Sequence, residues 1–115
     1  MSATDTGMQA AVRILARWGA TQAQMRLILG VPRALLSDVG QAALDGDQLD
    51  RISLILNIHA ALRGIFSNPE NLYGFVSMKN DNVFFKGRTP LDVMSDGDIQ
   101  SLRDTYHHIA TMAVW

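Results

Sequence analysis

The stretch QLDRISLILNIHAALRGIF, residues 48–66, predicts the longest helix of the chain. Hydrophobic residues recur in it three and four positions apart, and they form two apolar seams. One seam holds Ile52, Ile55, Leu56, His59, Leu62 and Phe66, and the other holds Leu54, Ile58, Ala61 and Ile65. An apolar arc this wide predicts a central helix that has neighbours on more than one side.

Shorter helical patterns flank this central stretch, and no segment shows the alternation that is typical of a strand. We expect helices over residues 7–18, 22–29, 32–43, 69–78, 90–94 and 99–113. Three of the helix starts have capping boxes, which begin at Thr21, Thr89 and Ser95, and Gly30 is a left-handed terminator of the second helix. Residues 45–47 are expected to form a turn. The sequence therefore predicts an all-α protein.

The composition narrows the class of protein. The chain has 115 residues, 48% of them hydrophobic, so it can bury a core of one domain or slightly more. It has no cysteine, which excludes disulfides, thiolate nucleophiles and zinc–thiolate sites. Its first residues lack a signal-peptide pattern, and no apolar run is long enough for a membrane span. We therefore expect a cytoplasmic protein without a membrane partner.

The side chains offer little catalytic chemistry. There is no glycine-rich phosphate loop and no Gly-x-Ser-x-Gly elbow. His59 lies on an apolar seam, where a packed core histidine is the expected role. His107 and His108 are adjacent, so they do not form the i, i+4 pair of a helical metal site. The sequence predicts neither an enzyme nor a metal or cofactor site.

Residues 22–43 have the local form of a helix-turn-helix, with the turn at Leu29-Gly30-Val31. Arg33 and Ser37 share a face of the second of these helices, so they are the candidate DNA-contacting residues. Asp38 is unfavourable beside phosphates, and the net charge of the whole chain is −1. Two interpretations stay open, namely contact with DNA and a helix pair that only supports the core.

From about Ala11 onward, the chain resembles the Xre/MbcA/ParS family of antitoxins. The resemblance is carried by the helix at residues 49–62, by Phe66-Ser67-Asn68-Pro69-Glu70, and by Asn82 followed by Gly87-Arg88-Thr89-Pro90-Leu91-Asp92-Val93-Met94. The chain departs from the family at three positions: Phe75 stands in place of a tryptophan, Arg26 in place of a small residue, and Asp38 in place of a basic residue.

This resemblance implies an antitoxin with an N-terminal helix-turn-helix region, residues 1–47, and a C-terminal toxin-binding domain, residues 48–115. The usual partner in the family is a RES-domain toxin that degrades NAD, and the antitoxin occludes the NAD pocket of that toxin. In many members the complex also binds operator DNA and represses its own operon. The family's antitoxins have no catalytic role and no cofactor.

Within that picture, the expected toxin-binding residues are Asn82, Lys86, Gly87, Arg88 and Trp115. Lys86 and Arg88 offer cationic donors, Gly87 allows a close backbone approach, and Trp115 is a typical interface anchor. The alternatives are that Arg88 is only solvated beside a helix start and that Trp115 closes the core.

Two other functions compete with this one, a stand-alone DNA-binding regulator and a purely structural or dimer-forming module. Small or polar residues form a third stripe on the central helix, namely Ser53, Asn57, Ala60, Gly64 and Ser67. This stripe is either a solvated face or a close helix contact. Together with the apolar content it favours a homodimer, without selecting the face.

Overall fold

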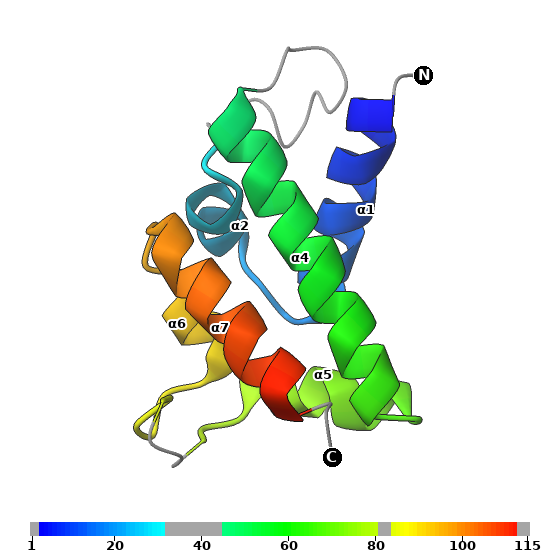
Figure 1. Ribbon diagram of the computed structural model, residues 1–115, viewed down its shortest axis with the longest axis vertical. Helices are drawn as coiled ribbons and strands as arrows, with labels where there is room; N and C mark the ends of the chain where they lie inside the picture. Colours follow the sequence, from blue (N-terminus) through cyan, green and yellow to red (C-terminus); the bar gives the residue numbers. More distant parts are fainter. Residues whose placement is uncertain (1–2, 32–44, 81–83, 113–115) are drawn as a thin grey trace.

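The computed structural model describes residues 3–31, 45–80 and 84–112, which form six α-helices (Figure 1). These are α1 (Ala3–Arg17), α2 (Gln22–Leu29), α4 (Gly46–Ile65), α5 (Pro69–Ser77), α6 (Pro90–Met94) and α7 (Ile99–Met112). The described residues contain no strand, only one isolated bridge between Asn80 and Arg88. The predicted all-α class is therefore confirmed, while the predicted helix 32–43 lies outside the described residues.

Helix α4 is the centre of the fold, as the two apolar seams predict. It runs between α1 and α7 and packs most extensively against these two helices, with further contacts to α2 and α5 (Figure 1). Ile52, Ile55 and Leu62 of one seam and Ile58 of the other are all 5% exposed or less. Both seams are thus used, because α4 has neighbours on several sides.

One hydrophobic core joins the N-terminal and C-terminal helices through α4. Trp18, directly after α1, is among the largest fully buried side chains. The other buried members of this core are Met8, Ala11, Leu15, Met25, Ile28, Leu29, Val31, Ile52, Ile55, Ile58, Leu62, Leu72, Val76, Leu91, Met94, Leu102 and Ile109.

None of the helices in the described residues combines the length and the apolar character that a membrane span requires.

Several helix boundaries follow local sequence signals. The Thr21 capping box is complete, with the Gln24 N–H donating to Thr21 Oγ1 at 3.1 Å and the Thr21 N–H donating to Gln24 Oε1 at 2.8 Å. Gly30 ends α2 at φ 66°, in the left-handed region. Thr89 Oγ1 accepts from the Asp92 N–H at 2.9 Å and so begins α6. The predicted box at Thr21 and the terminator at Gly30 are confirmed, and at Thr89 the bond from the Asp92 N–H to the threonine hydroxyl is confirmed.

Three boundaries differ from the predictions. Helix α1 begins at Ala3 rather than at Gly7. Asp45 is not part of a free turn, because it forms a capping box with Gln48 and so begins α4 at Gly46. Ser95 does not cap α7: it ends α6, and its hydroxyl donates to the Leu91 carbonyl at 2.7 Å.

Helix α7 is instead started by Asp98, whose carboxylate accepts from the backbone N–H of Gln100 at 2.9 Å. The Asp98 N–H in turn donates to the Asp96 carboxylate at 2.8 Å. The turn between α6 and α7 therefore uses a pair of aspartates, because Ser95 is already engaged by the preceding helix.

Candidate functional site

The end of α2 is the part of the predicted helix-turn-helix that the structure describes best. Gly30 takes the left-handed conformation, and the next residue, Val31, is buried with its N–H donating to the Arg26 carbonyl at 3.1 Å. The predicted DNA-contacting residues Arg33 and Ser37 lie outside the described residues. Their role in DNA contact stays a prediction.

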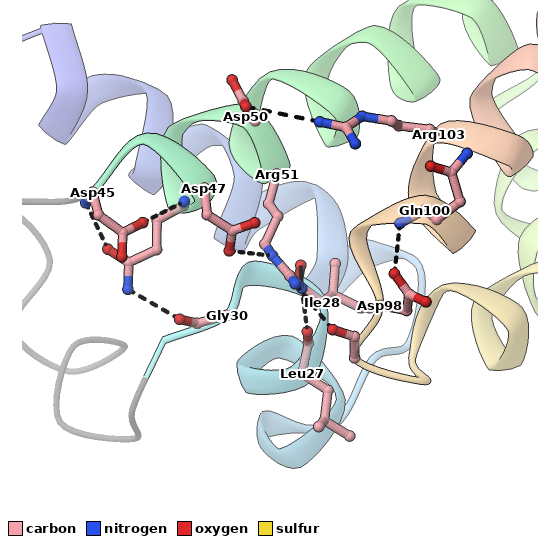
Figure 2. A network of polar contacts seen from close by, with 12 residues as sticks. Leu27, Ile28, Gly30, Asp45, Asp47, Asp50, Arg51, Asp98, Gln100 and Arg103 are labelled. Carbon is pink, nitrogen blue, oxygen red and sulfur yellow. Dashed lines mark hydrogen bonds and ion pairs between the residues drawn. The ribbon is translucent and has the colours of Figure 1, made fainter.

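Arg51 of α4 closes this end of α2 (Figure 2). Its guanidinium donates to the carbonyl oxygens of Leu27 at 3.0 Å and Ile28 at 3.4 Å, both in the last turn of α2. It also donates to the carbonyl of Gly97 at 2.9 Å, in the turn between α6 and α7. On its own helix, Nε pairs with the Asp47 carboxylate at 2.8 Å. One side chain therefore joins three parts of the fold.

The position of Arg51 suits a buried cation. Arg51 is only 8% exposed, and a buried charge is costly unless it is paired and hydrogen-bonded. The carbonyl end of a helix carries a partial negative charge, which complements the guanidinium. A neighbouring contact supports the same junction, because Gln48 Nε2 donates to the Gly30 carbonyl at 3.0 Å.

Sequence reasoning missed this junction. Asp47 and Arg51 are four residues apart on one helix, so the sequence could have predicted their ion pair. The carbonyl partners had none, because they come from segments 23 to 46 residues away.

The loop before α6, residues 80–88, contains four of the five predicted toxin-binding residues, and the structure describes three of these, Lys86, Gly87 and Arg88. Its ends are paired: the Asn80 N–H donates to the Arg88 carbonyl at 3.0 Å, and the Gly87 N–H donates to the Asn80 carbonyl at 2.7 Å. Lys86 and Gly87, which lie in the turn between these two ends of the loop, have positive φ values of 54° and 83°. Gly87 thus meets a backbone requirement of this loop, besides the close approach that the sequence suggested.

Arg88 binds its own loop. Its Nε donates to the Phe85 carbonyl at 2.9 Å, and a terminal guanidinium nitrogen donates to the Phe84 carbonyl at 3.2 Å. These two bonds use two of the five guanidinium N–H donors. Arg88 was predicted to contact a partner or to be solvated, and its role in shaping the loop was not predicted from the sequence.

Phe85 anchors the loop in the protein interior. It is fully buried, and its ring packs edge-on against Phe75 (centroids 6.2 Å apart) and His108 (5.3 Å). The half-buried Phe84 stacks on His108, with the centroids 5.1 Å apart and the planes 17° from parallel. The apolar run Val83-Phe84-Phe85 in an otherwise polar loop was the available sequence signal for this anchor.

The predicted contact residues therefore have different structural situations. Lys86 is exposed at the turn of the loop, whereas the side chain of Arg88 is engaged with backbone carbonyls. Asn82 and Trp115 lie outside the described residues, so their roles stay predictions. Among the described residues, no group of three or more histidine, cysteine, aspartate or glutamate side chains is placed to hold a metal ion.

Comparison with known proteins adds information on the N-terminal part. Residues 4–57 match the family described as Antitoxin Xre-like helix-turn-helix domain. The match covers slightly less than half of the chain, and it extends over α1 and α2 into α4. A search of curated proteins found no match. The match supports an antitoxin Xre-like helix-turn-helix domain in the N-terminal part of the chain.

Proposed function

We propose that this chain is the antitoxin of a type II toxin–antitoxin system and that its partner is a RES-domain toxin. The match of residues 4–57 to an antitoxin helix-turn-helix domain is the observation that carries the antitoxin function. The choice of a RES toxin rests on the resemblance of residues 48–115 to the Xre/MbcA/ParS family. In this proposal the chain has no catalytic role and no cofactor, and it acts by occluding the NAD pocket of the toxin.

The loop at residues 80–88 supplies the contact in this proposal. Lys86 presents an ammonium group with three donors, and Gly87 beside it has no side chain to keep a partner away. Arg88 holds the loop in shape through the carbonyls of Phe84 and Phe85. Asn82 and Trp115 complete the proposed toxin-binding set.

Co-expression with the toxin from the neighbouring gene tests the proposal, with cell growth and NAD content as readouts. Lys86→Ala is expected to weaken toxin binding about tenfold, because a charged hydrogen bond is lost. Lys79→Ala is the matched control, since Lys79 is also exposed and its removal changes the charge equally. Full protection by Lys86→Ala, by Arg88→Ala and by a chain truncated before Trp115 would overturn the site.

Operator binding is a second candidate function, favoured by the same helix-turn-helix match. We propose that Arg33 and Ser37 contact DNA and that the antitoxin represses its own operon; a stand-alone regulator would bind DNA without protecting against any toxin. In an electrophoretic mobility-shift assay, binding of the chain to the DNA upstream of its gene is expected to weaken in Arg33→Ala and at higher salt concentration. An unchanged shift for Arg33→Ala, relative to Arg103→Ala as the charge control, would count against this interface.

A homodimer in the cytoplasm is the remaining part of the proposal. The five residues of the small-residue stripe on and just after α4 are all exposed. Gly64, one of these residues, has open space beside it, because a Cβ added there would meet no atom within 4 Å. This face is therefore uncovered within the described part of the chain, where a second copy could pack against it. Sedimentation analysis tests the dimer, and a monomer at micromolar concentration would remove this part.

A further inference from the structure

A cavity of about 400 Å³ lies where α1, α4 and the start of α5 meet. The end of α1 supplies Arg17, α4 supplies His59 and Arg63, and α5 supplies Tyr73. A smaller hollow of about 230 Å³ shares Arg17 and His59 with it and adds Arg13. This cavity lies near the C-terminal end of α4 (Figure 1). It is therefore distinct from the Arg51 junction and from the loop at residues 80–88.

The charge of this cavity is one-sided. None of the described residues that line it is acidic, while Arg17 and Arg63 are both exposed cations. Within the described part of the chain, the ion pairs are Arg51 with Asp47 and Arg103 with Asp50, so neither cavity arginine has an acidic partner there. This local positive charge stands out in a chain whose net charge is −1.

The polar side chains of the cavity also have few partners. Arg17 makes one long hydrogen bond, from its Nη1 to Tyr73 Oη at 3.5 Å. His59 is half-buried beside Trp18, with ring centroids 6.5 Å apart. Its Nδ1 is buried without a hydrogen-bond partner among the described residues, so the ring can engage a ligand only through Nε2.

Burial lowers the pKa of His59 below its ordinary value of 6.5, and the charges of Arg63 and Arg17 lower it further. The charged groups and titratable groups around it are Arg13 and Arg17 of α1, Arg63 of α4 and Tyr73 of α5. An anion held among these groups would reverse the electrostatic effect and raise the pKa.

We propose that this cavity binds a small phosphate-bearing molecule, whose phosphate group is held by the guanidinium groups of Arg17 and Arg63. Guanidinium forks match the geometry of phosphate and bind it with charge-assisted hydrogen bonds. The volume is within the range of small-molecule sites and exceeds what one phosphate group fills. Phe66 and Leu72, which also line the cavity, provide apolar surface for the rest of the ligand.

Titration calorimetry of the full chain with inorganic phosphate and with phenyl phosphate tests this proposal. We expect saturable binding, with a dissociation constant of about 1 mM or below and with phenyl phosphate the tighter ligand. Arg17→Gln and Arg63→Gln are each expected to weaken binding about tenfold or more. Arg103→Gln removes the same charge from α7, outside the cavity lining, and is expected to change the affinity less than about twofold.

The pKa of His59, measured by NMR of its imidazole protons, gives an independent readout of phosphate binding. Phosphate is expected to raise the pKa of His59 in the unaltered chain and to have little effect on it in Arg63→Gln. Absence of saturable binding up to about 10 mM of either probe would overturn the proposal. Equal weakening by all three glutamine variants would also overturn it, because binding would then follow net charge alone. Circular dichroism of each variant establishes that it is folded.

Discussion

Removal of the Arg51 guanidinium is expected to destabilise the whole domain. The substitution Arg51→Met keeps most of the apolar stem and deletes the donors to the carbonyls of Leu27 and Gly97, at 3.0 and 2.9 Å. A hydrogen bond from a charged donor contributes about 1.5 kcal/mol or slightly more. The longer contact to Ile28, at 3.4 Å, adds little, and the pair with half-exposed Asp47 contributes under about 1 kcal/mol.

The expected loss is therefore about 3 kcal/mol in the free energy of unfolding. Domains of this size have total stabilities of about 5–15 kcal/mol, so the loss is a large fraction of the whole. It corresponds to a decrease in Tm of about 12 °C. Urea denaturation followed by circular dichroism measures the free energy, and differential scanning calorimetry measures the Tm.

Two comparison variants make this result specific. Arg103→Met removes an exposed arginine whose closest approach to Asp50 is 3.9 Å, and it is expected to cost less than about 0.5 kcal/mol. Arg51→Lys keeps the charge but not the guanidinium fork, so an intermediate stability is expected. A loss below about 1 kcal/mol for Arg51→Met, or full stability for Arg51→Lys, would refute the structural role assigned to the fork.

Three further substitutions are expected to have measurable effects on stability. Gly30→Ala should cost about 1–2 kcal/mol in urea denaturation, because residue 30 has a positive φ and an added Cβ would lie 3.1 Å from Arg51 atoms; an unchanged midpoint would contradict this. Phe85→Ala should cost about 3–4 kcal/mol by the same measurement, because it empties a fully buried site, and a loss under about 1 kcal/mol would refute the anchor. For His59, burial and two nearby arginines lower the folded-state pKa, so the unfolded chain binds the proton more tightly. Stability should then be fully present above about pH 6.5 and decrease as the pH falls below it, and His59→Gln should flatten this part of the profile.

Local physical chemistry accounts for the features that the sequence predicted correctly. The cap at Thr21 needs only its own helix turn, and the terminator at Gly30 needs only its own backbone. The central role of α4 follows from the width of its apolar arc, which must be covered by several neighbours. These features depend on residues within a few positions of one another.

The features that were missed depend on residues that meet only in the folded chain. The carbonyl partners of Arg51 come from α2 and from the turn before α7. The anchor at Phe85 needs His108 of α7, and Arg88 turns toward carbonyls whose position this anchor fixes. At the start of α7, the pattern predicted Ser95 as the cap, but α6 ends at Ser95 and Asp98 caps α7 instead.

The proposed division into residues 1–47 and 48–115 remains a prediction, and the contacts around it bear on how function should be tested. Asp47 and Gln48 stand on either side of this boundary. Asp47 pairs within α4 with Arg51, whose guanidinium binds carbonyls of α2, and Gln48 binds the Gly30 carbonyl directly. The core also packs Trp18 and Ile28 together with residues of α4. A fragment lacking residues 1–47 would expose this apolar surface, so its failure to neutralise a toxin would reflect unfolding as readily as a lost contact. Point substitutions such as Lys86→Ala, with Lys79→Ala as the control, leave the core intact and therefore separate toxin binding from folding.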